Sequence, residues 1–447
     1  MTTPARWHAA HAWLDDGGDA GPVADVLIEV ADGRFTAIES GVSAPPPDAT
    51  RLPGVTLPGL ANAHSHAFHR ALRGRTHAGA GTFWSWRDRM YEVAARLTPE
   101  SYLALARATY AEMALAGITC VGEFHYLHHA PGGIRYADPH AMSVALVEAA
   151  AHAGIRLTLL DTCYLTASVD GAPLTAAQRR FGDGDTARWA ERAGDFTPAG
   201  AHTRLGAAIH SVRAVPAAQL PEVVRWAEQR DAPLHVHLSE QRAENDACLA
   251  YHGRTPTQLL ADAGALGPRT TAVHATHLVG GDLAALGGSG TGSCLCPTTE
   301  RDLADGIGPA RALADAGSPL SLGSDSHAVI DLFEESRAVE LDERLRTERR
   351  GHFSPAELVR AATAAGHAAL GWADAGRIAV GQRADLVTVR SDSPRTAGTD
   401  PAGLIFAATA ADITQVIVDG RLVVRDGRHV SVDVPAALRA AIREVLP

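Results

Sequence analysis

The sequence contains no lysine, because all 40 of its basic side chains other than histidine are arginines. A centre of two metal ions bridged by a carboxylated lysine therefore cannot be built from this chain. The five cysteines are odd in number and scattered along the sequence, unlike the disulfide framework of a secreted protein. We expect them to be reduced thiols.

Long hydrophobic runs are also missing, although 46% of the residues are hydrophobic. No uninterrupted apolar run is long enough to cross a bilayer, and the first residues lack the basic start and hydrophobic run of a secretory signal. We therefore expect a cytoplasmic protein. A net charge of -11 without a basic cluster argues against nucleic acid and anionic membranes as partners, so a small molecule is the expected ligand.

The length of 447 residues favours a barrel-sized domain with a smaller companion. Short strand patterns broken by Gly and Pro occupy residues 1–57 and return in residues 376–447, where two Asp-Gly turns interrupt ITQVIVDGRLVVRDGRHV. We predict that both chain ends form one small β-sandwich domain. Residues 58–375, in which apolar runs alternate with Ala-rich helical stretches, predict an α/β fold, a (β/α)8 TIM-type barrel.

Eight apolar runs are the predicted barrel strands, each followed by a helical or loop segment. In chain order they are residues 55–66, 117–124, 155–164, 204–211, 233–240, 270–277, 291–297 and 319–326. Residues 99–117 and 141–154 carry apolar residues at helical spacing and end at Gly, which suits a helix C-terminus.

Polar side chains stand at the carboxyl ends of these predicted strands, where a barrel of this type gathers its catalytic groups. His64 and His66 end the first strand, His237 lies near the end of the fifth and Asp325 near the end of the eighth. Residues two apart in a strand point the same way, so His64 and His66 can face one ion. We predict that these four residues bind one divalent metal.

Imidazole nitrogen with carboxylate oxygen suits zinc better than calcium, and iron or manganese is the alternative. Cys294 and Cys296 on the seventh strand are a competing pair of soft ligands. We interpret them as buried strand thiols, since free cysteine is commonly a core residue.

Several longer motifs resemble the amidohydrolase superfamily: PGLANAHSH, SDSH after a strand, and GRIAVGQRADLV near the end. Within it, LPGLANAHSHAFHRALRG, FWSWRDRMYEVAARL, IHSVRAV, HVHLSEQ and CPTTERDLADGI resemble the formimidoylglutamate deiminases. The resemblance covers nearly the whole chain. It implies zinc-dependent hydrolysis of N-formimino-L-glutamate to N-formyl-L-glutamate and ammonia in histidine degradation, by an enzyme that we expect to be a homodimer.

The resemblance also implies roles for residues beyond the metal ligands. Asp325 would accept a proton from the attacking water, and Glu240 would pass a proton to the imino nitrogen. His274, at the end of the sixth strand, would stabilise the attacking oxygen or the tetrahedral intermediate.

A substrate with two carboxylates needs local cations in an acidic protein, and guanidinium groups bind carboxylates through paired hydrogen bonds. Arg213, after the fourth strand, and Arg87, in a loop after the first, are the candidates. Tyr126 and His210 at strand ends would add neutral donors. His69 is a further candidate, at a position where the family often has glutamine.

Three alternatives stay open from the sequence. An aminohydrolase of a purine, pyrimidine or triazine base would use the same metal site, and Trp84 and Trp86 could wall such a base. A ring-opening amidase of the hydantoin or dihydropyrimidine kind would normally need the missing lysine. A catalytically inactive barrel-shaped assembly protein would have no reason to keep a complete ligand set.

Overall fold

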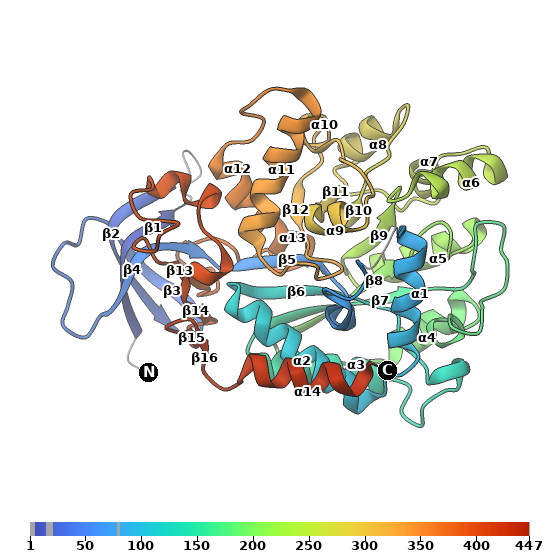
Figure 1. The fold of residues 1–447 in the computed structure, drawn as a ribbon, viewed down its shortest axis with the longest axis horizontal. Helices are drawn as coiled ribbons and strands as arrows, with labels where there is room; N and C mark the ends of the chain where they lie inside the picture. Colours follow the sequence, from blue (N-terminus) through green and yellow to red (C-terminus); the bar gives the residue numbers. More distant parts are fainter. Residues whose placement is uncertain (1–4, 15–20, 78–80, 447) are drawn as a thin grey trace.

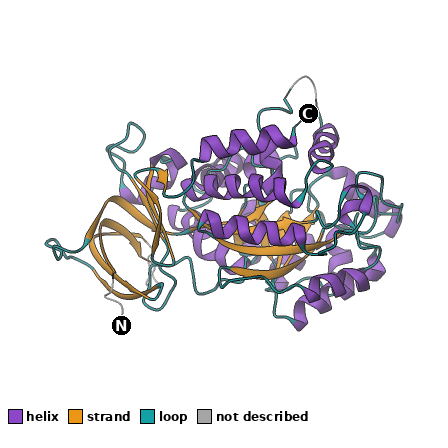
Figure 2. Ribbon diagram, turned by 90° about the horizontal axis from the view of Figure 1, so that it is seen from below, coloured by secondary structure: helices purple, strands orange, loops and turns teal. Residues whose placement is uncertain are grey.

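The computed structural model of the chain describes residues 5–14, 21–77 and 81–446. Its strands form two sheets of eight strands each, ordered β12-β11-β10-β9-β8-β7-β6-β5 and β16-β15-β14-β13-β4-β1-β2-β3. The first sheet forms the barrel, and the second stands beside it at the left of Figure 1. Helices surround the barrel strands, as Figure 2 shows from below.

The barrel sheet confirms the predicted (β/α)8 fold, because its neighbouring strands pair in parallel and in chain order. A parallel bridge between Ser65 and Asp325 joins the first strand to the segment after the last. The strands are β5 (Leu60–Ser65), β6 (Ile118–His125), β7 (Arg156–Cys163), β8 (Thr203–Ile209), β9 (Leu234–Leu238), β10 (Thr270–His274), β11 (Gly292–Leu295) and β12 (Leu320–Leu322).

The first predicted barrel strand is two strands in the structure, and here the prediction was wrong. β4 (Thr50–Pro58) belongs to the outer sheet and β5 to the barrel, with Gly59 between them. A Cβ atom at Gly59 would lie 2.4 Å from Thr119 Oγ1 and 2.6 Å from Asp385 Cβ. The chain therefore passes from one sheet to the other at a point where no side chain fits.

Strands from both ends of the chain form the second sheet, as predicted for the companion of the barrel. Its strands are β1 (Ala5–Leu14), β2 (Gly21–Ala31), β3 (Arg34–Glu39), β4, β13 (Leu386–Val389), β14 (Ile413–Val418), β15 (Arg421–Arg425) and β16 (Arg428–His429). The two Asp-Gly pairs, 419–420 and 426–427, have positive φ angles in the turns that flank β15, the geometry of tight hairpins. The predicted strand pattern of residues 376–389 is strand only in β13.

The helices lie around the barrel, and the predicted helices at residues 99–117 and 141–154 are α2 and α3. The helices are α1 (Phe83–Ala94), α2 (Pro99–Leu115), α3 (Ala141–Ala153), α4 (Thr186–Asp195), α5 (Leu220–Gln229), α6 (Arg242–His252), α7 (Pro256–Asp262), α8 (Asp282–Ser289), α9 (Pro297–Asp302), α10 (Ala310–Ala316), α11 (Leu332–Thr347), α12 (Pro355–Arg360), α13 (Gly366–Ala369) and α14 (Val434–Val445). The C-terminal helix α14 packs against α2 of the barrel (Figure 1). Among the described residues, no helix has the length and apolar character to span a membrane.

A buried arginine joins the two sheets at the end of the barrel opposite the polar strand ends. Arg156 begins β7 and is fully buried. Its Nη1 lies 3.0 Å from Asp385 Oδ1 and 3.1 Å from Asp419 Oδ1, and its Nη2 pairs with the other oxygen of Asp385. Both aspartates come from the C-terminal part of the chain, so this ion pair fixes the outer sheet to the barrel.

We expect Arg156→Met to destabilise the protein by about 3–5 kcal/mol, because it leaves a buried carboxylate without its partner. The apparent Tm in a thermal melt measures this loss. Arg89→Met is the control, since Arg89 pairs with Glu92 on the surface and such pairs contribute little. Equal Tm values for the two variants would show that the sheets do not depend on Arg156.

Candidate active site

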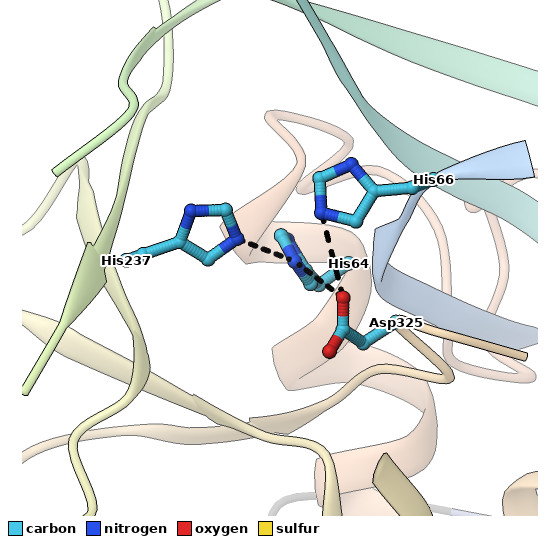
Figure 3. A group of neighbouring side chains, drawn as sticks. All are labelled: His64, His66, His237 and Asp325. Atoms are coloured by element: carbon cyan, nitrogen blue, oxygen red, sulfur yellow. Dashed lines mark hydrogen bonds and ion pairs between the residues drawn. The ribbon is translucent and has the colours of Figure 1, made fainter. Parts of the chain in front are cut away.

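Four predicted metal ligands meet at the carboxyl ends of the barrel strands (Figure 3). The ligand atoms of His64, His66, His237 and Asp325 all lie within 4.8 Å of one another, and all four residues are buried. His64 Nε2 lies 3.1 Å from His237 Nε2 and 3.2 Å from Asp325 Oδ1, and His66 Nε2 lies 3.4 Å from the same oxygen. Residues far apart in the sequence thus face one small volume.

The second ring nitrogen of two of these histidines is bonded to the backbone. His66 Nδ1 donates to the carbonyl of Phe124 at 3.0 Å, and His237 Nδ1 donates to the carbonyl of His210 at 2.9 Å. A neutral imidazole carries one proton, so both rings present a lone pair on Nε2. This is the usual way in which a protein fixes the tautomer of a metal-binding histidine.

The electrostatics of this group favour a bound cation. Burial lowers the pKa of the His64, His66 and His237 rings. Burial alone would raise the pKa of Asp325, but its hydrogen bond to His64 and the charges of the neighbouring histidines hold it well below its usual value. A single proton on His64 Nε2 could form a hydrogen bond to either His237 Nε2 or Asp325 Oδ1, but not to both. The lone pairs that remain on the other ligand atoms repel one another unless a cation lies among them. The donor set fits a divalent metal ion.

Two polar residues lie beside the ligands. His274 Nε2 is 3.8 Å from Glu240 Oε1 and 3.8 Å from Asp325 Oδ2. Burial raises the pKa of Glu240 to about 7, although His274 opposes that shift. Burial would lower the pKa of His274, but the carboxylates of Glu240, Glu300 and Asp325 together raise it well above its usual value. A carboxyl group with a pKa near 7 is suited to proton transfer.

Two arginines line a pocket that also contains these polar residues. Arg213 Nη1 lies 3.6 Å from Glu244 Oε2, and the Arg87 guanidinium lies over the rings of Trp84 and Tyr91, at 4.5 and 5.5 Å from their centroids. The Nε atoms of both arginines are buried and have no hydrogen-bond partner among the described residues. The pocket thus has free guanidinium donors.

The other predicted substrate-binding residues line the same pocket, which is otherwise aromatic. Tyr126, His210 and His69 are among its lining residues, and His69 Nε2 lies 3.1 Å from the Tyr126 hydroxyl. Tyr91, Tyr164, Phe181, Met90 and Glu244 also line the pocket and were not predicted. Tyr164 carried a usable signal, since it ends a predicted strand.

Two predictions about individual segments are tested by the structure. Arg87 was placed in a loop, but it lies in helix α1, which begins after a capping box formed by Thr82 and Ser85. Cys294 and Cys296 are free and buried, as predicted, and neither belongs to the group of ligand atoms found among the described residues.

Comparison with known proteins identifies the family. The model of the amidohydrolase family matches residues 55–423. The chain belongs to the amidohydrolase family. This amidohydrolase is 40% identical over 422 residues to a formimidoylglutamate deiminase of Pseudomonas aeruginosa, covering 91% of this chain and 92% of the relative.

Two further similarities extend over most of the amidohydrolase. An 8-oxoguanine deaminase of the same organism is 31% identical over 432 residues, with 92% of each chain covered. The crystal structure of an amidohydrolase from Brucella melitensis has a TM-score of 0.90 and 34% identity, covering 99% of this chain and 100% of that one. The protein is therefore a hydrolase that acts on a carbon–nitrogen bond.

We expect the purified amidohydrolase to contain about one equivalent of a divalent transition metal, since its four donors form one site. His237→Ala should reduce the metal content well below that of the unchanged protein. His235→Gln is the control, because His235 lies on the same strand and bonds to the carbonyl of Ala369 at 2.9 Å, a bond that glutamine can keep. Elemental analysis after exhaustive dialysis measures the content, and an equal metal content in the His237 variant would remove this residue from the ligand set.

Proposed function

We propose that the enzyme hydrolyses N-formimino-L-glutamate to N-formyl-L-glutamate and ammonia, with zinc as its metal. The observation that carries this proposal is a pair of half-buried arginines, Arg87 and Arg213, whose Nε atoms are buried and unpaired among the described residues and which line the same pocket as the metal-ligand group. The similarity to a formimidoylglutamate deiminase supports it. An acyclic substrate with two carboxylates matches a pocket that has unpaired guanidinium donors.

Zinc is proposed from the donor set of three imidazoles and one carboxylate, which would hold it through His64, His66, His237 and Asp325. When bound, the ion supplies the Lewis acidity that makes water a nucleophile at neutral pH. The residues around it then have to move protons and bind the substrate.

Proton transfer is assigned to the polar groups beside the ligands. Water adds to the formimino carbon, and the bond from that carbon to the terminal nitrogen breaks. Both protons of the water end on the departing nitrogen. Asp325 accepts the first, and Glu240 delivers one proton to the imino nitrogen and a second to the departing amine, which leaves as ammonia. The proton held by Asp325 and the hydroxyl proton of the adduct replace the two that Glu240 gives up. His274 faces both carboxylates and stabilises the charge that develops on the attacking oxygen.

The substrate carboxylates are assigned to the arginines. Arg213 and Arg87 bind them through their unpaired guanidinium donors, and Tyr126 and His210 add hydrogen bonds. His69, bonded to Tyr126, fixes that hydroxyl. With the carboxylates held at this side of the pocket, the formimino carbon is presented to the metal site.

A deaminase of a purine, pyrimidine or triazine base is the alternative. The aromatic lining of the pocket by Trp86, Tyr91, Tyr164 and Phe181 favours it, and so does the similarity to an 8-oxoguanine deaminase. A flat base without carboxylates, however, would leave the Nε donors of both arginines without a hydrogen-bond acceptor.

The location in the cytoplasm, the place of the reaction in histidine degradation and the homodimer stay predictions. The place of the reaction in histidine degradation rests on the resemblance of the sequence motifs to the formimidoylglutamate deiminases.

The proposal is tested by ammonia release from a panel of N-formimino-L-glutamate, N-formimino-L-aspartate, guanine and cytosine. We expect kcat/KM to be highest for N-formimino-L-glutamate, because its two carboxylates can reach both arginines. Preference for guanine or cytosine would favour the alternative function and leave the reaction type unchanged.

Arg213→Met should raise KM for N-formimino-L-glutamate by about 30-fold or more, the effect of losing a buried charged hydrogen bond of about 2 kcal/mol. Steady-state kinetics with parallel metal analysis measures it, and the metal content should not change. Arg337→Met is the control, since Arg337 is similarly buried but bonds to the carbonyls of Phe406 and Ala408. An unchanged KM in the Arg213 variant would exclude this residue from carboxylate binding.

A further inference from the structure

A second carboxylate faces His274 from the side of the ring opposite the metal-ligand group. Glu300 lies in α9 and is 6% exposed. Its Oε1 atom is 3.4 Å from His274 Nδ1 and accepts a hydrogen bond of 3.0 Å from the backbone N–H of Cys296. The sequence reasoning gave Glu300 no role.

The contacts of the two ring nitrogens of His274 differ in kind. Nδ1 faces Glu300, whereas Nε2 faces Glu240 and Asp325, each at 3.8 Å. An ionised carboxylate can only accept a hydrogen bond, so the contact with Glu300 requires the ring proton on Nδ1. The Nε2 atom is then the one that is directed at the reacting groups.

The backbone of His274 does not hold the ring in an ordinary strand conformation. His274 has a φ angle of 68° and Ala275 one of 51°, a region that side-chain-bearing residues seldom adopt. Such a conformation persists only where surrounding contacts determine it. Glu300 can serve as such a contact, because its own carboxylate is fixed by the N–H of Cys296.

The helix that carries Glu300 is held from a second direction. Glu335 of α11 is fully buried, and it accepts a hydrogen bond of 2.9 Å from the N–H of Thr298 and another from the Thr298 hydroxyl. Two buried glutamates therefore stabilise the first turn of α9, but only Glu300 is in contact with His274.

We propose that Glu300 is a positioning residue that holds a proton on Nδ1 of His274 and sets the orientation of the ring, so that Nε2 faces the site of attack. The inference rests on the proposed function only in assigning His274 a part in turnover. Glu300 acts through His274 and is neither among the residues that line the pocket nor in the metal-ligand group.

A double-mutant cycle tests this role in the metal-loaded enzyme. Glu300→Leu should lower kcat by about 10- to 100-fold, the usual cost of losing a group that orients an active-site histidine. KM and metal content should stay close to those of the unchanged enzyme. In a His274→Asn background, Glu300→Leu should cause no further loss, because the ring through which it acts is already gone.

Glu335→Leu is the matched control, because it also removes a buried carboxylate that binds the start of α9. We expect it to lower the Tm as Glu300→Leu does but to leave kcat largely unchanged. The proposal would be overturned if Glu335→Leu lowered kcat as much as Glu300→Leu does. It would also be overturned if the double variant lost kcat by the product of the two single losses, because Glu300 would then act independently of His274.

A neutron crystal structure of the metal-loaded wild-type enzyme shows directly which ring nitrogens of His274 are protonated. This measurement requires no activity assay and no variant. We expect deuterium on His274 Nδ1, directed at Glu300, and its absence there would overturn the proposal. If the wild-type enzyme does not release ammonia from N-formimino-L-glutamate, the proposed substrate is wrong, yet the neutron map still decides the role of Glu300. The two failures are thus distinguishable.

Discussion

The closure of the barrel between its first strand and the segment after its last one is the constraint on which the site depends. Asp325 donates its backbone N–H to the carbonyl of His64 at 3.0 Å. Beside it, the side chain of Asn62 exchanges two hydrogen bonds with Ser324, one with the hydroxyl at 2.7 Å and one with the N–H at 2.9 Å. Because these bonds join segments about 260 residues apart in the sequence, the same contacts that close the ring place a carboxylate against two imidazoles. The backbone of Asp325, with a φ angle of 38°, shows how sharply the chain turns to do so.

A buried glutamate supports the end of the first barrel strand, where this closure takes place. Glu123 of β6 accepts hydrogen bonds from the Ser65 hydroxyl at 2.8 Å and from the N–H of Ala67 at 2.7 Å. Burial raises the pKa of Glu123 to about 7, against the effect of these hydrogen bonds. Since Ser65 lies between His64 and His66, the bonds to Glu123 fix the segment that carries both imidazoles. The segment with His64 and His66 is thus held by backbone and side-chain contacts outside the metal-ligand group.

The sequence analysis found the site residues that stand at the ends of barrel strands. It missed the residues whose role depends on tertiary packing. His64, His66, His237 and Asp325 could be found because a parallel barrel brings the carboxyl ends of its strands to one rim. Glu300 and Glu244 lie on helices that follow strands, where a glutamate is commonly a solvated surface residue, and only the tertiary contacts show that they are buried. The break between two sheets at Gly59 was missed, although the Pro58-Gly59 pair is a turn signal in the sequence. The helix of Arg87 was missed, although Phe83, Trp86, Met90 and Val93 recur at helical spacing.

The distribution of charge around the site bears on which substrates it can accept. Carboxylates gather on the side of the metal ligands, where burial first and then Glu240 raise the pKa of Asp305 to about 9. Arg87 and Arg213 line the same pocket, and their Nε atoms have no partner among the described residues. A buried cationic donor that is left without a partner on binding costs far more than a missing apolar contact. A ligand without carboxylates would therefore be discriminated against even if its ring filled the aromatic part of the pocket. The unpaired Nε donors, more than the aromatic lining, therefore support the acyclic substrate with two carboxylates that we propose.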